Sequence, residues 1–273
     1  MNELHRFLIK LDDPNKVERK RNYQGVLNAL SSKYPSPEKN EKPLKNHREV
    51  CVIWNEKLHA PILRGLRDES ERVRELSAEI TLFFFGHMAC SSPMTLSYIL
   101  PVLRQRLVKQ PGDEVIETSE EVRLLLLTIL TKILEMTTDE QEDDLKIHLD
   151  DLVRMLGSCI IDTFADVKEM ACNDVGLLAK VLSKDFHFNA ANLINPLAKS
   201  MTHQQKKVRV ACIQAVGVVL HHSGFDEFQL IGSHLAQRLF DPVPVVRLSV
   251  SKGQAHHMFS RFMSLRFFFT KLL

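Results

Sequence analysis

The sequence predicts an all-α fold, an α-solenoid of about five to six antiparallel helix pairs. A turn motif recurs, in which an acid precedes a valine by five residues and a cation follows the valine directly. Its best copies are Asp68, Val73 and Arg74; Asp162, Val167 and Lys168; and Asp241, Val246 and Arg247. Apolar residues recur at helical spacing, and no stretch alternates as a strand would. A fixed internal spacing of this kind is typical of a repeat array.

The anchor valines give the period of the array. They are Val73, Val122, Val167, Val208 and Val246, separated by 49, 45, 41 and 38 residues. Helix-pair repeats of the HEAT and armadillo type have periods of about 40–47 residues. The 273 residues, 44% of them hydrophobic and 26% charged, are enough to bury a large core.

The helices are predicted in chain order. Asn2–Leu11 and a second helix from Pro14 to about Leu30 form a degenerate first pair, with Asp12 five residues before Val17 but Glu18 where a cation should stand. Residues 31–46 hold three prolines and several lysines, which predicts a mobile loop. Residues 1–46 are therefore set apart from the array at 47–252 and from a divergent aromatic and basic tail at 253–273.

Within the array, apolar spacing and proline positions define the remaining elements. Pro61 should bend the first helix, because proline removes a helical hydrogen bond. The expected helices are Arg48–Leu66, Glu71–His87, Thr95–Val108, Glu120–Met136, Leu145–Thr163, Asp166–Leu182, Asn189–Met201, Gln204–His221, Asp226–Phe240 and one from Val243 onward. Lys109–Ser119 is an acidic insertion and Asp139–Asp144 an acidic turn. The second unit is expected to lack the turn acid, and His203 replaces it in the fourth.

Each motif position has a predicted structural role. The valine closes the two helices, and small residues four and nine positions later (Ala171, Cys212, Gly176 and Gly217) should allow close helix approach. The acid should cap the second helix and reach the cation of a neighbouring repeat, building an Asp–Arg ladder. The predicted stacking residues are Asp68, Val73, Arg74, Val122, Arg123, Asp162, Val167, Lys168, Val208, Arg209, Asp241, Val246 and Arg247.

The sequence carries no recognisable catalytic, cofactor-binding or metal-binding motif. The chain has no Gly-rich phosphate loop, zinc-protease or hydrolase signature. His221-His222 and His256-His257 are adjacent, so each pair diverges by about 100° on a helix. Cys159 and Cys172 could approach each other, but two small core residues is the better interpretation. We therefore expect no enzyme activity, no cofactor and no metal.

Net charge and cysteine positions indicate the cellular environment in which the chain is expected. The net charge is +2, which gives no strong attraction to nucleic acid or membrane. None of the five cysteines lies in a CxxC motif, so buried free thiols in a reducing compartment are expected. The first residues lack an apolar signal region, and the longest apolar run, 124–134, is too short to span a bilayer. The sequence predicts a soluble cytoplasmic protein.

The Asp…Val-Arg helix pair over residues 47–252 resembles the HEAT repeat. Within that class the chain is similar to the family of HEAT-repeat dynein axonemal assembly factors, in the stretches LRDESERVRELSAEITLFFFGHMACSSPMTLSYILPVLRQRLVKQPGDEVIETSEEVRLLLLTILTKILE and VRVACIQAVGVVLHHSGFDEF. The resemblance implies a non-enzymatic, co-chaperone-like scaffold in the cytoplasmic pre-assembly of dynein arms for motile cilia. Dynein intermediate or heavy chains, other assembly factors and chaperones would be its partners.

Two further expectations accompany this resemblance. The family's proteins are longer, and after Lys252 the tail departs from the repeat pattern, so we expect a truncated or alternative C-terminal form. The alternative function is a generic HEAT adaptor, of the nuclear transport receptor or phosphatase-scaffold type. Residues 113–151 carry 13 acids and 3 bases, a net charge of −10, and could serve such an adaptor. Function is expected where the units differ, above all at Lys109–Ser119 and Asp139–Asp144.

Overall fold

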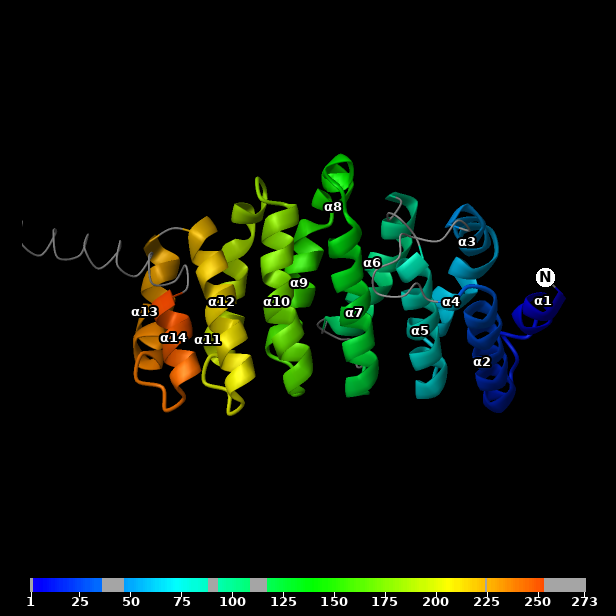
Figure 1. Cartoon of the computed structure of the whole chain (residues 1–273), viewed down its shortest axis with the longest axis horizontal. Coiled ribbons are helices and arrows are strands. Elements are labelled where there is room, and N and C mark those ends of the chain that lie inside the picture. The colour runs from blue at the N-terminus through cyan, green and yellow to red at the C-terminus, as the bar shows by residue number, and fades with distance from the viewer. Residues whose placement is uncertain (1, 36–46, 88–92, 109–116, 224, 253–273) are drawn as a thin grey trace, which may run out of the picture. The chain divides into compact units, whose positions relative to one another are not determined.

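The computed structural model describes residues 2–35, 47–87, 93–108, 117–223 and 225–252, which form helices and no strand. Figure 1 shows these helices arranged as successive antiparallel pairs within each part of the chain. The predicted all-α solenoid is therefore confirmed. The chain divides into two compact units, Met1–Thr138 and Asp139–Leu273.

The first unit stacks three long helices in one layer. Here α2 packs on α5, and α5 packs on α7; α4 and α6 pair with α5 and α7 as the second layer. The elements of this unit are α1 (Asn2–Leu8), α2 (Lys16–Lys33), α3 (His47–Ile53), α4 (His59–Gly65), α5 (Glu71–His87), α6 (Pro93–Leu107) and α7 (Glu120–Met136).

The second unit repeats this two-layer arrangement. Helix α10 packs on α12 and α12 on α14, while α9, α11 and α13 pair with them. Its helices are α8 (Glu142–Lys146), α9 (Leu149–Ile160), α10 (Ala165–Val181), α11 (Ile194–Ser200), α12 (Lys206–His222), α13 (Phe225–Arg238) and α14 (Pro244–Lys252). The five anchor valines are at most 1% exposed, so they lie in the core of their units.

The helix predicted at Arg48–Leu66 is broken into three segments. Between α3 and α4 lies a π-helical turn, Trp54–Leu58. Pro61 has no N–H to donate to the carbonyl four residues earlier, and its ring crowds that carbonyl, so the turn before it widens. The wider turn places Trp54 in the core, where its ring lies 4.8 Å from that of Phe84.

A predicted turn and part of a predicted loop are helical. The acidic segment Asp139–Asp144 was predicted as a turn, but it is helical, forming a 3-10 turn at Asp139–Gln141 and then the start of α8. Helix α2 extends to Lys33, into the predicted loop, because Tyr34 N–H still bonds to Leu30 O (2.8 Å) and ends the helix there. Residues 36–46 of that loop lie outside the described residues.

Of the four small residues predicted to allow close helix approach, Gly176 does not, whereas Gly65, which was not among them, does. A Cβ on Gly176 would meet nothing within 4 Å, so this position does not serve helix packing. A Cβ on Gly65 would instead lie 2.2 Å from Ser77 Oγ and 2.5 Å from the Tyr23 hydroxyl. That hydroxyl donates to Pro61 O (3.0 Å), so α2, α4 and α5 meet at Gly65.

Among the described residues, no helix is long and apolar enough to cross a membrane.

Candidate functional site

The inter-helix turns carry the predicted motif, and their acids cap the helices that follow. Asp68 Oδ1 accepts from Ser70 N–H (2.8 Å), as Asp241 Oδ1 does from Val243 N–H (3.0 Å). Asp162 repeats this contact with Phe164 N–H. A side-chain oxygen that accepts from the amide two residues on stabilises a turn and satisfies an orphan donor at a helix start.

In five repeats an arginine clamps its own turn from the other side. Arg74 Nη1 donates to the carbonyls of Asp68 (2.9 Å) and Glu69 (3.1 Å). The same contact pair, to residues six and five positions earlier, is made by Arg19, Arg123, Arg209 and Arg247. The Nη1 group of each guanidinium therefore stabilises the turn that precedes its own helix.

The other side of the guanidinium binds the acid of the next helix pair. Arg74 Nε and Nη2 each lie 2.7 Å from a carboxylate oxygen of Glu117. The same two-bond contact joins Arg19 to Asp68 (2.8 and 3.0 Å) and Arg209 to Asp241 (2.8 and 2.9 Å). From these contacts we propose that the motif residues hold neighbouring pairs together, which is a structural role rather than a chemical one.

Glu117 is a ladder acid that the sequence analysis missed. The expectation that the second unit lacks its turn acid is wrong, because Glu117 lies five residues before Val122 and occupies that place. Its side chain is fully buried, and its carboxylate also accepts a hydrogen bond from Arg106 Nη2 (2.5 Å). Burial alone would raise the pKa of Glu117, but the hydrogen bonds from Arg74 and Arg106 lower it overall. Allowing glutamate as well as aspartate in the motif would have found it.

The first repeat is shifted by one residue from the prediction. Asp13 Oδ1, not Asp12, accepts from the amide two residues on, Asn15 N–H (2.8 Å). Arg19 therefore stands in the cation position that was assigned to Glu18. The count from Val17 was misleading because Val17 is 58% exposed and is not an anchor.

Lys168 makes a different contact from the arginines. Its Nζ donates to Ser200 Oγ (3.2 Å) and Ile160 O (3.3 Å), and no described carboxylate lies within ion-pair distance. The next turn carries His203, whose Nδ1 accepts from Gln205 N–H (3.2 Å) in place of a carboxylate. Burial lowers the pKa of Lys168, and burial together with the nearby Lys168 charge lowers that of His203.

One turn beyond Lys168, two thiols meet between α10 and α12. Cys172 Sγ lies 3.5 Å from Cys212 Sγ, and both side chains are buried. The thiol next to Cys172 is thus Cys212, not the Cys159 that the sequence analysis considered. The hydrogen bond to Cys212 and burial raise the pKa of Cys172, which favours an unreactive thiol.

An acidic and partly apolar surface lies where α8 meets the turn after α10. Lys146 Nζ contacts Asp185 (2.7 Å), and Lys184 Nζ lies 3.7 Å from Glu142, which ties the two segments together. Ile147 is 80% exposed and Phe188 is 70% exposed beside these pairs. The acids Asp139, Glu140, Asp143 and Asp144 lie on the same short segment and form no ion pair among the described residues.

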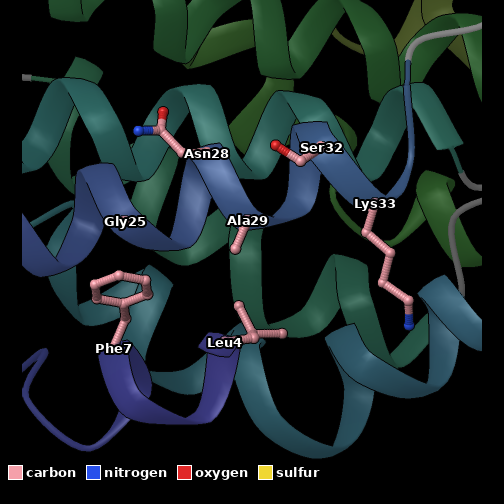
Figure 2. Close-up of a pocket in the computed structure, with 7 residues that line it drawn as sticks. All are labelled: Leu4, Phe7, Gly25, Asn28, Ala29, Ser32 and Lys33. Carbon is pink, nitrogen blue, oxygen red and sulfur yellow. The ribbon is translucent and has the colours of Figure 1, made fainter. Parts of the chain in front are cut away.

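A cavity of about 400 Å³ lies between α1 and α2. Figure 2 shows its lining residues, Leu4, Phe7, Gly25, Asn28, Ala29, Ser32 and Lys33. The Phe7 ring sits so close to Gly25 that a Cβ there would lie 2.5 Å from it. The lining holds one charged group, Lys33, which is paired with Glu49 (2.5 Å), so the cavity offers no catalytic constellation.

The candidate metal positions within the described part of the chain form no metal site. Across residues 2–35, 47–87, 93–108, 117–223 and 225–252, no three His, Cys, Asp or Glu side chains are placed to hold a metal ion. The rings of His221 and His222 are 5.2 Å apart and nearly perpendicular. His256-His257, the tail at 253–273 and residues 109–116 of the acidic insertion lie outside the described residues.

Stacked helix pairs joined at their turns by an arginine–carboxylate ladder define an α-solenoid repeat protein. Comparison with solved structures finds proteins of similar fold. An engineered protein matches with a TM-score of 0.58 at 14% identity, over 96% of this chain and 98% of that one. A designed armadillo repeat protein, solved in complex with the peptide (KR)4, matches with a TM-score of 0.56 at 15% identity, over 94% and 99%. These identities support the fold alone.

Sequence comparison shows the family to which the chain belongs. The family model described as "Dynein axonemal assembly factor 5-like, TPR repeats" matches residues 10–273, and the chain belongs to this family. The dynein axonemal assembly factor 5 of Xenopus laevis is 34% identical over 248 residues, which is 91% of this chain and 27% of that protein. The Homo sapiens protein is 33% identical over 250 residues, 91% of this chain and 28% of its own length. The chain thus spans just over a quarter of these relatives.

Proposed function

We propose that this chain acts as a non-enzymatic scaffold in the cytoplasmic pre-assembly of axonemal dynein arms for motile cilia. The observation that carries the proposal is the family match over residues 10–273, together with relatives that are named for dynein assembly. The fold supports it, because repeat arrays generally act by presenting extended binding surfaces. The described chemistry agrees, since buried charged groups such as Glu117, Arg209 and Asp241 are used in the ladder.

Dynein intermediate or heavy chains, other assembly factors and chaperones are the partners that this role requires. We infer that they contact the surface formed by residues 139–148 and 184–188, which differs from the other units. Residues 139–151 carry seven acids and one lysine, a net charge of −6. Ile147 and Phe188 add exposed apolar area beside them. Charge on this surface would steer a basic partner, and the apolar side chains would anchor it.

Affinity purification from ciliating cells tests the proposal. The tagged chain should recover dynein intermediate and heavy chains, and a version extended by further repeats should recover at least as much. Normal outer and inner dynein arms in multiciliated cells that lack the protein would contradict the assembly role.

A charge-reversal variant tests the surface separately. Changing the exposed acids Asp139, Glu140 and Asp143 to lysine should reduce recovery of dynein subunits without changing the melting temperature. The matched control reverses three other exposed acids, Glu56, Glu71 and Glu135, and should leave recovery unchanged. Equal loss in both variants would indicate a general charge effect and no specific surface.

The alternative function is a generic adaptor of the nuclear transport receptor or phosphatase-scaffold type. The observation that favours it is the same acidic concentration, because a solenoid can bind basic segments of many proteins. Recovery of a nuclear-transport GTPase or phosphatase subunits, with no dynein subunit, would support this alternative.

A further inference from the structure

The contact between α10 and α12 differs from the helix contacts that carry an arginine–carboxylate pair. In those contacts an arginine holds the acid of the following helix pair through two hydrogen bonds. Between α10 and α12, Lys168 donates to Ser200 Oγ (3.2 Å), and His203 stands in the position of the acid. No carboxylate of the described residues lies within ion-pair distance of Lys168. These two helices are therefore packed together without the ionic link found elsewhere.

Two thiols meet at this same contact. Cys172 Sγ on α10 lies 3.5 Å from Cys212 Sγ on α12, and the two residues are 40 positions apart in the sequence. They stand five positions after one anchor valine and four positions after the next. The corresponding residues of α5 and α7 are Ala78 and Leu126, which have no reactive group. Both thiols are at most 2% exposed, so their contact is shielded from solvent.

Small side chains around the thiols allow α10 and α12 to lie close together. Ala171 on α10 and Ala211 and Ala215 on α12 are all buried. In a disulfide the two sulfurs are about 2 Å apart, and the Cα atoms are usually about 4.4–6.8 Å apart. From the observed 3.5 Å, bond formation requires the sulfurs to approach by about 1.5 Å. Rotation of the two cysteine side chains and a small shift of the helices supply such a movement.

We propose that Cys172 and Cys212 are a redox-sensitive pair, which hydrogen peroxide converts into a disulfide that joins α10 to α12. The peroxide oxidises one thiol to a sulfenic acid, and one water is released. The sulfur of the other thiol then attacks the sulfenic sulfur, the S–O bond breaks, and a second water leaves. Two thiols and one peroxide thus give one disulfide and two waters, and both electrons pass to the peroxide.

The disulfide supplies a bond between repeats where the ionic link is missing. It is covalent, and a thiol reductant reverses it by exchange. The pair is therefore a modification site in the packed interior of the array, and this role does not depend on the dynein assembly role.

Oxidation of the pair should be slow. The thiolate is the form that reacts with peroxide. The contact with Cys212 and burial raise the pKa of Cys172, and the Lys168 charge opposes them in part. Little thiolate is therefore present at neutral pH, and an oxidant reaches it only when the helices open locally. The pair stays reduced in a reducing compartment and responds to sustained oxidation.

Peroxide treatment of the folded full chain tests the proposal. After incubation with hydrogen peroxide, free thiols are blocked with iodoacetamide in denaturant, and the protein is digested without reductant. Mass spectrometry should find peptides of one monomer linked through Cys172 and Cys212, and dithiothreitol should remove the link. The linked form should melt about 5 °C or more above the reduced form, because the bond restricts a loop of 40 residues in the unfolded chain.

Single substitutions provide the controls. Cys172→Ala and Cys212→Ala should each abolish the link and the difference in melting temperature between treated and untreated protein. Because both forms of one variant are compared, any stability lost through the substitution itself cancels. Cys159→Ala is the matched control, since Cys159 is also buried, and it should leave both results unchanged.

Three results would overturn the proposal. If peroxide produces a sulfinic acid at Cys172 or Cys212, or links either residue to another cysteine, the two thiols are not a disulfide pair. If the link appears only at denaturant concentrations that unfold the chain, the folded contact does not form it. If the linked form melts no higher than the reduced form, the disulfide does not strengthen the contact between α10 and α12.

Discussion

The guanidinium of Arg74 and the carboxylate of Glu117 form a two-bond ion pair between residues 43 positions apart in the sequence, with both N–O distances 2.7 Å. Arg74 is 8% exposed at its side chain and Glu117 is fully buried. Because water cannot replace either partner, the pair must stay intact for the two charges to be tolerated. We therefore propose that the motif joins neighbouring repeats, a role that substitution of its residues tests.

Arg74→Gln should destabilise the protein by about 3–5 kcal/mol, since it leaves the Glu117 charge buried with less compensation. Arg74→Glu should be at least as severe, because it adds a like charge. Arg72→Gln is the matched control: Arg72 lies two residues away and is 36% exposed, so its pairs with Glu75 and Glu79 are worth less than about 1 kcal/mol. Denaturant unfolding measures both. An Arg74 variant with an unchanged melting temperature and lost partner binding would contradict the structural role.

Acid should weaken the ladder through Glu117 and Asp241, whose pKa values are lowered. Burial opposes ionisation of both groups, but bonds from Arg74 and Arg106, and from Arg209, outweigh it. A carboxyl with a lowered folded-state pKa stabilises the fold above its unfolded pKa, and this contribution is lost as pH falls through the folded value. The free energy of unfolding should therefore decline below about pH 4.5, the ordinary value for glutamate.

Glu117→Gln provides the control for this pH dependence. The variant should be less stable at pH 7, and its unfolding free energy should change less between pH 5 and pH 3, as estimated from ordinary carboxyl pKa values of roughly 4. Equal slopes in variant and parent over this range would show that Glu117 does not contribute to acid sensitivity.

Two glycine-to-alanine changes should have opposite effects. Gly65→Ala should destabilise by about 1–3 kcal/mol, because its Cβ would overlap Ser77 Oγ and the Tyr23 hydroxyl. Gly176→Ala, with nothing within 4 Å, should stabilise α10 by up to about 1 kcal/mol through helix propensity. Thermal unfolding of the two variants measures both changes in stability. Destabilisation by Gly176→Ala would restore the original expectation of close helix approach there.

Replacing Lys168 and Arg209 with methionine should reduce stability by different amounts. Arg209→Met leaves the fully buried Asp241 carboxylate without its main partner, so a loss of about 3–5 kcal/mol is expected. Lys168→Met removes a buried cation that faces only Ser200 Oγ and a carbonyl, and should cost less than about 1.5 kcal/mol. Similar losses in the two variants would mean that Lys168 has an ionic role as important as that of the arginines.

Thiol labelling should follow burial. In the folded protein, Cys51, which is half-buried, should react with iodoacetamide faster than Cys172 or Cys212. Both latter thiols are buried, and the pKa of Cys172 is raised by its contact with Cys212 and by burial, so little thiolate is present. Peptide mass spectrometry after timed labelling measures the order. Denaturant should abolish the difference, and labelling of Cys172 in the native state would contradict the packing.

The sequence by itself determined the local structure of this protein. The bounds of α5 and α7 follow from their apolar periodicity and agree with the prediction to the residue. The clamp between Arg74 and the carbonyls of Asp68 and Glu69 spans five and six residues of one turn, so a fixed sequence spacing encodes it. Recurrence of that spacing was sufficient to predict the solenoid, whereas the family was predicted from the resemblance of the stretches that begin at Leu66 and Val208.

Only the tertiary structure decided which residues meet across repeats. Arg74 pairs with Glu117 and Cys172 lies against Cys212 because helices about 40 residues apart in the sequence stack side by side. The sequence separation between such partners varies from repeat to repeat, so spacing alone does not identify them. The one-residue shift to Asp13 and Arg19 and the close helix approach at Gly65 but not at Gly176 have the same origin. Each depends on which side chains a neighbouring helix pair covers, and that is set by packing rather than by local sequence.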